Sequence, residues 1–577
     1  MWYQPKLRWP PLLELSLIAS QAAAQFNNPP GVDIWCGKAY RSTNSSYDPG
    51  GWFQEPSTSS HPLLRLSAKS RMTIYLDTDE IAALLIGAEV SYQLGEAISE
   101  SSITTPAQKL QVTVLAGDVK LGSASVDVGS VDNEVPISLA GLDPSLDPYT
   151  LTINAELANL TTYSTNTSFS YLPYPDNYGS VARLDNLYGG IHAQRGKNSS
   201  WEVIFPYTYY VQWTLYWDTD VSTLDEYASY GFNLVHIVPT GSLGEQPFPW
   251  GQFQPYLDRA AELGIWLQYD VIWEPGNTTE MIEQVTALRT HPSILSWYQS
   301  DEPDGKGNPT NSTGLAYKKI KELDPYHPIS LALNCENFYY GEYAAGADII
   351  VPDVYPISTN TSYSTVYDTV CNSTYGCCGC DNCGIGPTVF DDIPRRLDEF
   401  RRRDELIGWA KTQWFAPQAF GNETFWTRYP TAHELDVMTL LAVNHGAKGL
   451  TMWDYPTTAE LFNVTRDMAA LFTGTTAASL FLGAPRFQGL PVSGSDDLDA
   501  AAWVDEKNGQ AMVSVVNLNY YDISEPLSVA LPEGLIASTL ETSLWGDDQW
   551  KVGPNGSLIA SDGVGGLATA VFVVNIS

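Results

Sequence analysis

Basic residues are scarce in this 577-residue sequence. Lys and Arg together number 30, against 66 Asp and Glu, and the formal net charge at pH 7 is −36. So large an acidic excess repels phosphate backbones and anionic membrane surfaces, so we expect neither nucleic acid nor a membrane as a partner. Beyond the first 24 residues, no stretch is long and apolar enough to span a bilayer.

Histidine is also scarce, with seven residues in all, so the sequence indicates neither a His-based triad nor a His-rich metal site. There is no glycine-rich phosphate loop and no HExxH zinc motif. Five cysteines between Cys371 and Cys383 crowd a Gly-rich loop without His, where we expect disulfides. Cys36 and Cys335 stand apart, and the odd total leaves one thiol unpaired or paired between chains. We therefore expect no metal and no cofactor.

The N-terminus predicts secretion. Residues 1–24 place two basic residues before a mostly apolar segment and three alanines, as a signal peptide does. Twelve Asn-X-Ser/Thr sequons favour N-glycans on a secreted, extracellular protein. They lie at Asn44, Asn159, Asn166, Asn198, Asn277, Asn311, Asn360, Asn372, Asn422, Asn463, Asn555 and Asn575.

The length exceeds what one core can organise, so we expect several domains. Residues 25–178 and 485–577 show short alternating runs separated by turn residues, which is typical of β-sandwiches. Neither part contains a catalytic constellation. We expect the first to support the rest of the chain or form a substrate rim. We expect the second to be a structural cap rather than a carbohydrate-binding module.

Between 179 and 484, apolar runs alternate with helical segments. The strand candidates are 203–210, 234–239, 265–272, 294–300, 329–333, 348–354, 414–419 and 449–453. The helical stretches are 223–230, 256–263, 279–289, 315–323, 393–406 and 432–444. We therefore predict an α/β fold, a (β/α)8 TIM barrel flanked by N-terminal and C-terminal all-β sandwich-like domains. Residues 358–390 form a Cys-rich insertion after the sixth strand, at the barrel mouth.

The fourth strand candidate ends in an unusual concentration of charge. The stretch HPSILSWYQSDEPDG at 291–305 places three carboxylates in four residues at Asp301, Glu302 and Asp304. Like charges raise each other's pKa, which keeps a carboxyl group protonated as a general acid.

The strand ends of a barrel converge on one face, so the residues that close each run form the candidate site. The candidate catalytic residues are Glu302, Asp301 and Asp454. The candidate substrate-binding residues are Tyr209, Asp270, Trp273, Glu274, Asn334, Asp353, Tyr355, Gln418 and Trp453. Carboxylates, amides and aromatic rings on one rim are what sugar chemistry uses.

Residues 200–482 resemble the (β/α)8 glycoside hydrolases, loosely those of clan A. The likeness is carried by FPYTYY, HPSILSWYQSDEP, DVYPI, PQAFG and GAKGLTMWDYP at strands one, four, six, seven and eight. HPSI followed by a strand ending in Glu is similar to the acid/base segment of the family 2 enzymes. The resemblance implies a carbohydrate substrate and an acid/base role for Glu302.

Two positions depart from that pattern. Clan A enzymes carry Asn before the acid/base Glu, where this chain has Asp301, and a nucleophilic Glu at the end of strand seven, where it has Gln418. The Asp-Glu pair is also similar to the substrate-assisted hexosaminidases of families 20 and 123, in which the Asp orients the acetamido group. The second catalytic group stays open between Asp301 and a rim carboxylate. The rim candidates are Asp454, Asp270 and Glu274, ahead of Glu423.

We expect a secreted glycoside hydrolase that cleaves a β-linked bond in an oligo- or polysaccharide, with retention. One alternative is a substrate-assisted β-N-acetylhexosaminidase that uses the Asp301–Glu302 pair. The other is a non-catalytic glycan-binding wall protein on a barrel scaffold, since a fold does not specify a function.

Overall fold

The computed structural model describes residues 34–39, 50–103, 108–157, 161–238, 249–271, 278–357, 363–364, 369–370, 386–423, 426–546 and 549–577. The predicted leader, the cysteine cluster at 371–383 and the site candidates Trp273 and Glu274 lie outside these residues.

Eight parallel strands form one curled sheet in the order β24-β21-β20-β19-β18-β17-β16-β25. Their bounds in chain order are β16 (Tyr207–Gln212), β17 (Leu234–Val238), β18 (Trp266–Asp270), β19 (Ile294–Tyr298), β20 (Ile329–Leu333), β21 (Ile349–Pro352), β24 (Thr412–Gln413) and β25 (Leu450–Tyr455). The segment after β24 also bridges in parallel to β25, at Phe415–Leu450 and Gln418–Trp453, so the two edges of the sheet meet. The eight strand candidates therefore lie side by side in one parallel, barrel-like sheet.

Two strands differ from their predicted bounds by more than an end residue or two. The run 203–210 divides at Phe205 and Pro206 into β15 (Glu202–Ile204) and β16, and only β16 joins the barrel sheet. Pro206 has no N–H to donate to a ladder, which ends the first strand there. The seventh strand, predicted at 414–419, is regular only over β24, which lies just before that run. The predicted run itself, which contains Pro417, is paired by isolated bridges.

Helices follow most of the barrel strands. The predicted ones are α2 (Thr223–Ser229), α3 (Trp250–Leu263), α4 (Thr278–Leu288), α5 (Ser312–Leu323), α7 (Asp392–Ile407) and α8 (Ala432–Asn444). The helix α3 begins six residues before its predicted start and includes Pro255. Three more, α6 (Tyr340–Ala344), α9 (Ala459–Thr473) and α10 (Thr475–Gly483), are outside the predicted set.

Alternation along the strands divides the buried side chains of the barrel between two clusters. Tyr210, Tyr298 and Tyr355 belong to one cluster with Trp414, inside the curled sheet. Tyr209 belongs to the other, which packs between the strands and the surrounding helices. Because successive side chains of a strand point to opposite faces, adjacent residues fall into different clusters.

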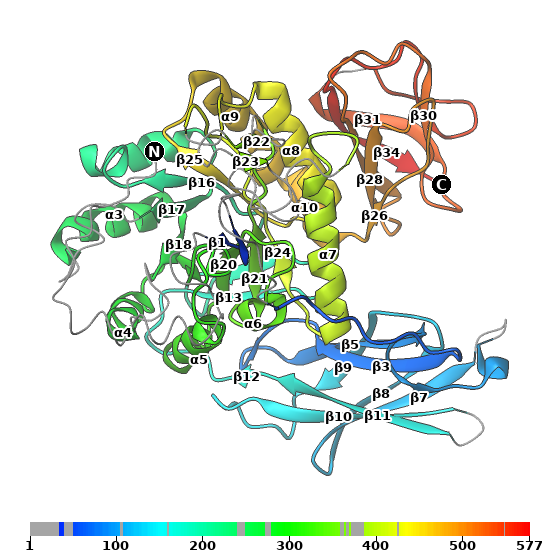
Figure 1. Cartoon of the computed structure of the whole chain (residues 1–577). Coiled ribbons are helices and arrows are strands. Elements are labelled where there is room, and N and C mark those ends of the chain that lie inside the picture. The colour runs from blue at the N-terminus through cyan, green and yellow to red at the C-terminus, as the bar shows by residue number, and fades with distance from the viewer. Residues whose placement is uncertain are drawn as a thin grey trace.

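Two β-rich regions flank the barrel (Figure 1). The first contains two four-stranded sheets that share one apolar core. Their strands are β6 (Glu96–Ala97), β3 (Leu63–Ser70), β5 (Ile81–Ser91) and β9 (Asn133–Ser138) in one, and β11 (Thr162–Phe169), β10 (Tyr149–Glu156), β7 (Lys109–Ala116) and β8 (Val119–Asp127) in the other. A short sheet of β13 (Val181–Leu184), β14 (Ile191–Gln194) and β15 contributes side chains to the cluster inside the barrel.

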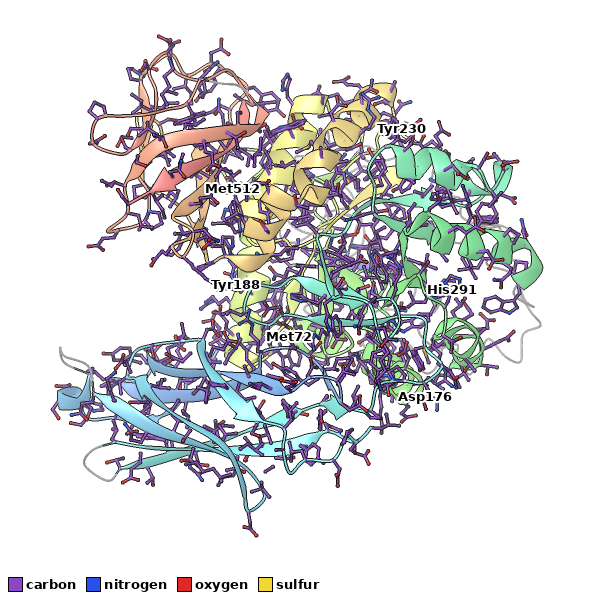
Figure 2. All side chains as sticks on the ribbon, turned by 180° about the vertical axis from the view of Figure 1, so that it is seen from behind. Met72, Asp176, Tyr188, Tyr230, His291 and Met512 are labelled. Carbon is purple, nitrogen blue, oxygen red and sulfur yellow. A yellow bond between two sulfur atoms is a disulfide. The ribbon has the colours of Figure 1, made fainter. Side chains whose placement is uncertain are left out.

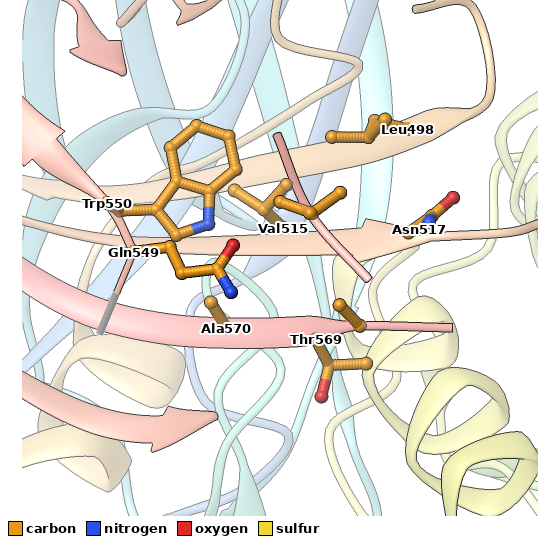
Figure 3. A pocket seen from close by; sticks show the side chains of 9 residues that line it. Leu498, Val515, Asn517, Gln549, Trp550, Thr569 and Ala570 are labelled. Carbon is orange, nitrogen blue, oxygen red and sulfur yellow. The ribbon is translucent and has the colours of Figure 1, made fainter. Parts of the chain in front are cut away.

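The C-terminal region also contains two sheets around one core. They are β26 (Arg486–Gln488), β28 (Leu498–Asp505), β29 (Gln510–Asn517), β34 (Thr569–Ile576) and β31 (Ala537–Gly546), and β27 (Val492–Ser493), β30 (Leu527–Val529), β33 (Leu558–Ala560) and β32 (Lys551–Val552). Figure 3 shows a cavity beside Trp550, Leu498 and Val515 in this region. Its volume of about 10 Å³ holds about one water molecule and no sugar ring.

A cleft of about 690 Å³ is lined by residues of both β-rich regions and of the barrel, among them Tyr188, Lys411, Lys448 and Phe487. Figure 2, seen from behind, shows Tyr188 where the three parts meet. Lys411, Thr412 and Lys448 precede or open the strands β24 and β25, so the cleft lies at the amino ends of the strands, opposite the predicted site. No helix in the described part of the chain combines the length and apolar character of a membrane span.

Candidate active site at the carboxyl ends of the strands

Glu302 is positioned by the turn that follows β19. The strand is fully buried, and Gln299 anchors the chain beyond it by donating to the carbonyls of Thr313 (3.1 Å) and Gly346 (2.6 Å). Glu302 then takes a left-handed backbone conformation, with φ of +47°. A residue other than glycine adopts this backbone conformation only where its surroundings hold it there. Such residues are common at functional sites. The Glu302 side chain is buried, with 5% of the residue exposed.

Two residues from neighbouring strand ends meet the Glu302 carboxyl group. Asn334, directly after β20, donates from Nδ2 to Glu302 Oε1 at 3.1 Å. Asp353, directly after β21, lies within side-chain hydrogen-bonding reach of Glu302. Glu302 Oε2 and Asp353 Oδ1 are both buried without an N–H or O–H partner among the described residues. A proton held between the two carboxyl groups satisfies both of them.

The pKa values of this pair are displaced together. Burial raises the pKa of Glu302, and the neighbouring Asp301 charge raises it further, while hydrogen bonds from Asp353 and Asn334 oppose the rise. Burial raises the pKa of Asp353 well above its usual range, and the Glu302 charge adds to this. Two buried carboxyl groups in contact do not both ionise readily, and the proton of the pair is favoured on Asp353, whose pKa is raised further.

Asp301 faces a different set of partners from Glu302. Its Oδ1 accepts from the Tyr298 hydroxyl at 2.8 Å, and its Oδ2 accepts from Lys306 Nζ at 2.8 Å. Burial opposes the charged form, but the Lys306 charge and these hydrogen bonds leave the pKa of Asp301 below its ordinary value. Asp301 is therefore a carboxylate with both oxygen atoms engaged.

Asp304 is the third carboxylate of the stretch, and it holds the loop to the end of β20. Its oxygens accept from the backbone N–H groups of Gly305 (2.8 Å), Asn334 (3.2 Å) and Cys335 (2.8 Å). Burial raises the pKa of Asp304 to about 7, against the effect of these three donors. Its role is to fix Asn334 beside Glu302.

Aromatic rings surround the carboxyl pair. Tyr210 lies 5.7 Å from Tyr298 and 5.1 Å from Trp453, between ring centroids. Burial, then the charges of Asp353 and Glu302, raise the pKa of Tyr355 well above its ordinary value, which places the phenol close to the pair. His236 packs edge-on to Tyr210 at 4.3 Å, and burial lowers its pKa to about 4, so the imidazole is neutral. The carboxyl pair is therefore bordered by aromatic rings on the inner side of the sheet.

Asp454 occupies a separate position on the rim. It is buried beside Trp453, and its Oδ2 accepts a hydrogen bond from Gln212, at the end of β16. Burial raises the pKa of Asp454 to about 6. No hydrogen bond or ion pair joins it to Glu302 or Asp353 in the described part of the chain. Asp270, at the end of β18, is half-buried, and Glu423 is half-buried in the turn that Trp426 bridges.

Two of the expected binding residues are engaged elsewhere. Tyr209 packs toward the helices, and its hydroxyl bonds to Thr465 Oγ1 of α9 at 2.9 Å, while Tyr210 occupies the inward position. Gln418 is buried, accepts from the Ile357 N–H at 2.8 Å and donates to the Ile357 carbonyl at 3.0 Å. The inward-facing tyrosine of this strand is therefore Tyr210 and not the expected Tyr209, because neighbouring side chains of a strand point to opposite faces of the sheet. Gln418 holds the loop after β21 in place.

Several residues of the site have no motif of their own in the sequence. Lys306, Tyr298 and His236 become neighbours of the carboxylates only through the turn after β19 and the curvature of the sheet. Cys36 and Cys335, which the sequence left apart, form a disulfide across 299 positions of the chain. No sequence signal pointed to the disulfide.

No group of three or more His, Cys, Asp or Glu side chains in the described part of the chain is placed to hold a metal ion.

No family model matches the sequence, and no curated protein matches it. Solved structures that resemble the chain include glycoside hydrolases. An FMN-binding β-glucuronidase from Facaelibacterium prausnitzii L2-6 has a TM-score of 0.33 and 11% identity, over 89% of this chain and 70% of that one. A putative glycoside hydrolase from Bacteroides vulgatus ATCC 8482 has a TM-score of 0.39 and 9% identity, over 87% of this chain and 100% of that one.

An α-amylase from Geobacillus thermoleovorans, in complex with acarbose, has a TM-score of 0.41 and 9% identity, over 62% of this chain and 91% of that one. All three TM-scores are below 0.5, so the assignment of a function rests on the geometry of the site.

Proposed function

We propose that this protein is a glycoside hydrolase that cleaves a β-linked glycosidic bond, with Glu302 as the general acid and then the general base. The observation that carries the proposal is the buried Glu302–Asp353 carboxyl pair at the strand ends, oriented by Asn334. A glycosidase needs a carboxyl group that still holds a proton at the working pH, and this pair supplies one.

The chemistry of the pair follows from its single proton. Protonation of the glycosidic oxygen by Glu302 leaves the pair with two negative charges, which the Lys306 ammonium partly offsets. The resulting carboxylate then draws a proton from the attacking water, which restores the shared proton. Asp353 thus holds the proton of the pair in the resting state. Once that proton has passed through Glu302 to the glycosidic oxygen, the second negative charge makes the pair a stronger base.

For the second catalytic group we propose Asp454. It is a rim carboxylate outside the proton-sharing pair, and with a pKa of about 6 it is ionised at neutral pH, as a nucleophile must be. The substrate-assisted alternative is less well supported. It requires a carboxylate free to stabilise a cationic oxazoline, whereas both oxygens of Asp301 bind Tyr298 and Lys306.

The non-catalytic alternative would leave the rim acids scattered or paired with basic side chains. Glu302, Asp353 and Asn334 instead converge from three neighbouring strands. Among Asp301, Glu302, Asp353 and Asp454, the salt bridge that the described residues show is that of Asp301 with Lys306. The convergence supports an enzyme rather than a glycan-binding protein.

We also propose that the protein is secreted and glycosylated. Among the described sequons, Asn166, Asn198, Asn311, Asn422, Asn463 and Asn555 are exposed, as glycan carriers must be. The Cys36–Cys335 disulfide suits an oxidising compartment. Release of glycans by an endoglycosidase should lower the apparent mass of the protein purified from a culture medium, and an unchanged mass would contradict this.

We further propose three folding units, at 25–178, 179–484 and 485–577. Each of the two β-rich regions has an apolar core of its own, which supports this division, and the barrel core also takes in Trp503, Met512 and Val573 of the C-terminal region. Limited proteolysis should cut first near these boundaries.

The test of the enzymatic proposal is Glu302→Gln, which keeps the shape and removes the transferable proton. The wild-type protein is screened on aryl β-glycosides with and without a 2-acetamido group. On a poor leaving group, kcat/KM should fall by about 10² to 10⁴, and the loss should be much smaller on dinitrophenyl glycosides, which need no acid. Glu342→Gln, exposed on α6, is the matched control. An inactive wild type, or Glu302→Gln within threefold of it, would overturn the proposal.

A further inference from the structure

The amide of Asn334 is held by a residue far away in the sequence. Trp35 donates from its indole Nε1 to Asn334 Oδ1 at 2.8 Å, across 299 positions of the chain. Figure 1 shows β1 (Ile34–Trp35) close to β20. An indole N–H can only donate, so it requires the amide oxygen on its side and turns the NH₂ group toward Glu302. In the reversed orientation, two donors would meet at Trp35 and the amide oxygen would face the Glu302 carboxyl group.

Three features hold the Trp35 ring in place. Trp35 ends β1, which pairs with β2 (Lys38–Ala39) through a two-residue turn at Cys36 and Gly37, both with positive φ. Cys36 is linked by a disulfide to Cys335, the residue after Asn334. The indole also lies against the backbone of Gly305, where an added Cβ would stand 2.4 Å from two of its ring atoms.

The Asn334 backbone has its own supports. Its N–H donates to Asp304 at 3.2 Å, and its carbonyl accepts from Arg396. Loss of the Trp35 N–H therefore leaves the backbone in place and frees only the rotation of the amide. This separates an effect on Glu302 from a general loss of structure.

We infer that Trp35, fastened by the Cys36–Cys335 disulfide, is a positioning residue of the active site that sets the Asn334 amide and through it the protonation of Glu302. The catalytic part of this inference rests on the proposed function. The effect of Trp35 on the Glu302 carboxyl group can be measured without any substrate. The segment Ile34–Ala39 thereby acts on the catalytic centre through Trp35, in addition to being linked to it by the disulfide.

The sign of the effect follows from the hydrogen bond. The charged groups that face Glu302 are Asp301, Asp304, Lys306 and Asp353. Against them, the Asn334 NH₂ group donates to the carboxylate and lowers the Glu302 pKa. When the amide is free to turn, this donor is lost part of the time and the pKa rises.

The experiment uses Trp35→Phe, which removes the N–H and keeps an aromatic ring over Gly305. The pKa of Glu302 is measured by ¹³C NMR on protein labelled at the glutamate carboxyl carbon, with Glu302→Gln to assign the signal. We expect a rise of about one unit in the Glu302 pKa, a fall of about tenfold in kcat with KM nearly unchanged, and a fall in Tm no larger than that of the control. The matched control is Trp545→Phe, which removes an indole N–H bonded to Thr569 Oγ1 at 3.2 Å in the C-terminal region.

A double-mutant cycle separates positioning from structure. Asn334→Ala should raise the Glu302 pKa by itself, and Trp35→Phe should then add no further shift, because it acts only through the amide. The Cys36→Ser/Cys335→Ser pair should shift the pKa in the same direction. If that double variant does not fold, Trp35→Phe decides alone.

An unchanged Glu302 pKa in Trp35→Phe would overturn the inference, and so would a further shift in the Asn334→Ala background. If the wild-type protein cleaves no glycoside but the pKa still shifts, the proposed function fails while the positioning role stands.

Discussion

Replacement of Asp353 by Asn tests whether Glu302 and Asp353 share a proton. The variant keeps the side-chain shape and can still hydrogen-bond to Glu302 through its NH₂ group. It removes the second carboxyl group, whose burial and contact with Glu302 keep one proton on the pair. The proton-donating form of Glu302 should then be lost at lower pH.

The magnitude can be bounded from the contact. Two unit charges about 4 Å apart repel by about 4 kcal/mol at an effective dielectric constant of about 20. At about 1.4 kcal/mol per pKa unit, this corresponds to a shift of at most about three units. Lys306 and Asn334 already offset part of the repulsion. We therefore expect the alkaline limb of kcat/KM to move down by about one to two pH units.

The assay is the pH dependence of kcat/KM on an aryl β-glycoside with a poor leaving group. The limb reports the upper macroscopic pKa of the pair in the free enzyme. Asp348→Asn is the control, because Asp348 is a half-buried carboxylate that pairs with Lys321 at 3.0 Å before the opposite end of β21. A limb that stays in place, or moves to higher pH, in Asp353→Asn would refute proton sharing.

Three further predictions concern other residues. Burial raises the pKa of Asp436 in α8 to about 8. The folded state therefore keeps a proton on this carboxyl group that the unfolded chain releases near pH 4. The protein loses stability as the pH rises between these two values. Asp436→Asn should therefore raise the free energy of unfolding, measured by urea denaturation, by at most ~4 kcal/mol at pH 7 and leave it unchanged near pH 4. Equal effects at the two pH values would contradict this explanation. Asp301→Asn breaks the Lys306 ion pair and should lower kcat alike on plain and 2-acetamido substrates, whereas a loss of about 10² confined to the latter would restore the substrate-assisted mechanism. Alkylation without reductant, read by mass spectrometry, should label one or two of the five cysteines at 371–383, and five labelled cysteines there would revive a metal or thiol role.

The positions of the barrel strands could be read from the sequence, because each is a short apolar run that ends in polar residues. Such runs are buried on both faces of a parallel sheet whatever the details of packing. The same reasoning predicted that Glu302, Asn334 and Asp353 lie on one rim, because the carboxyl ends of parallel strands converge. The interruptions at Pro206 and Pro417 blurred two of the strands, because each proline removes a ladder donor.

The sequence by itself determined the alternation of strands and helices, the convergence of the strand ends and the concentration of carboxylates after β19. These depend on local patterns that operate over a few residues. Only the tertiary structure decided that Tyr210 faces inward in place of Tyr209, that Asp353 lies within hydrogen-bonding reach of Glu302 while Asp301 pairs with Lys306, and that Trp35 donates to Asn334. Each of these depends on the curvature of the sheet and on contacts between distant segments, and no local periodicity encodes such a contact.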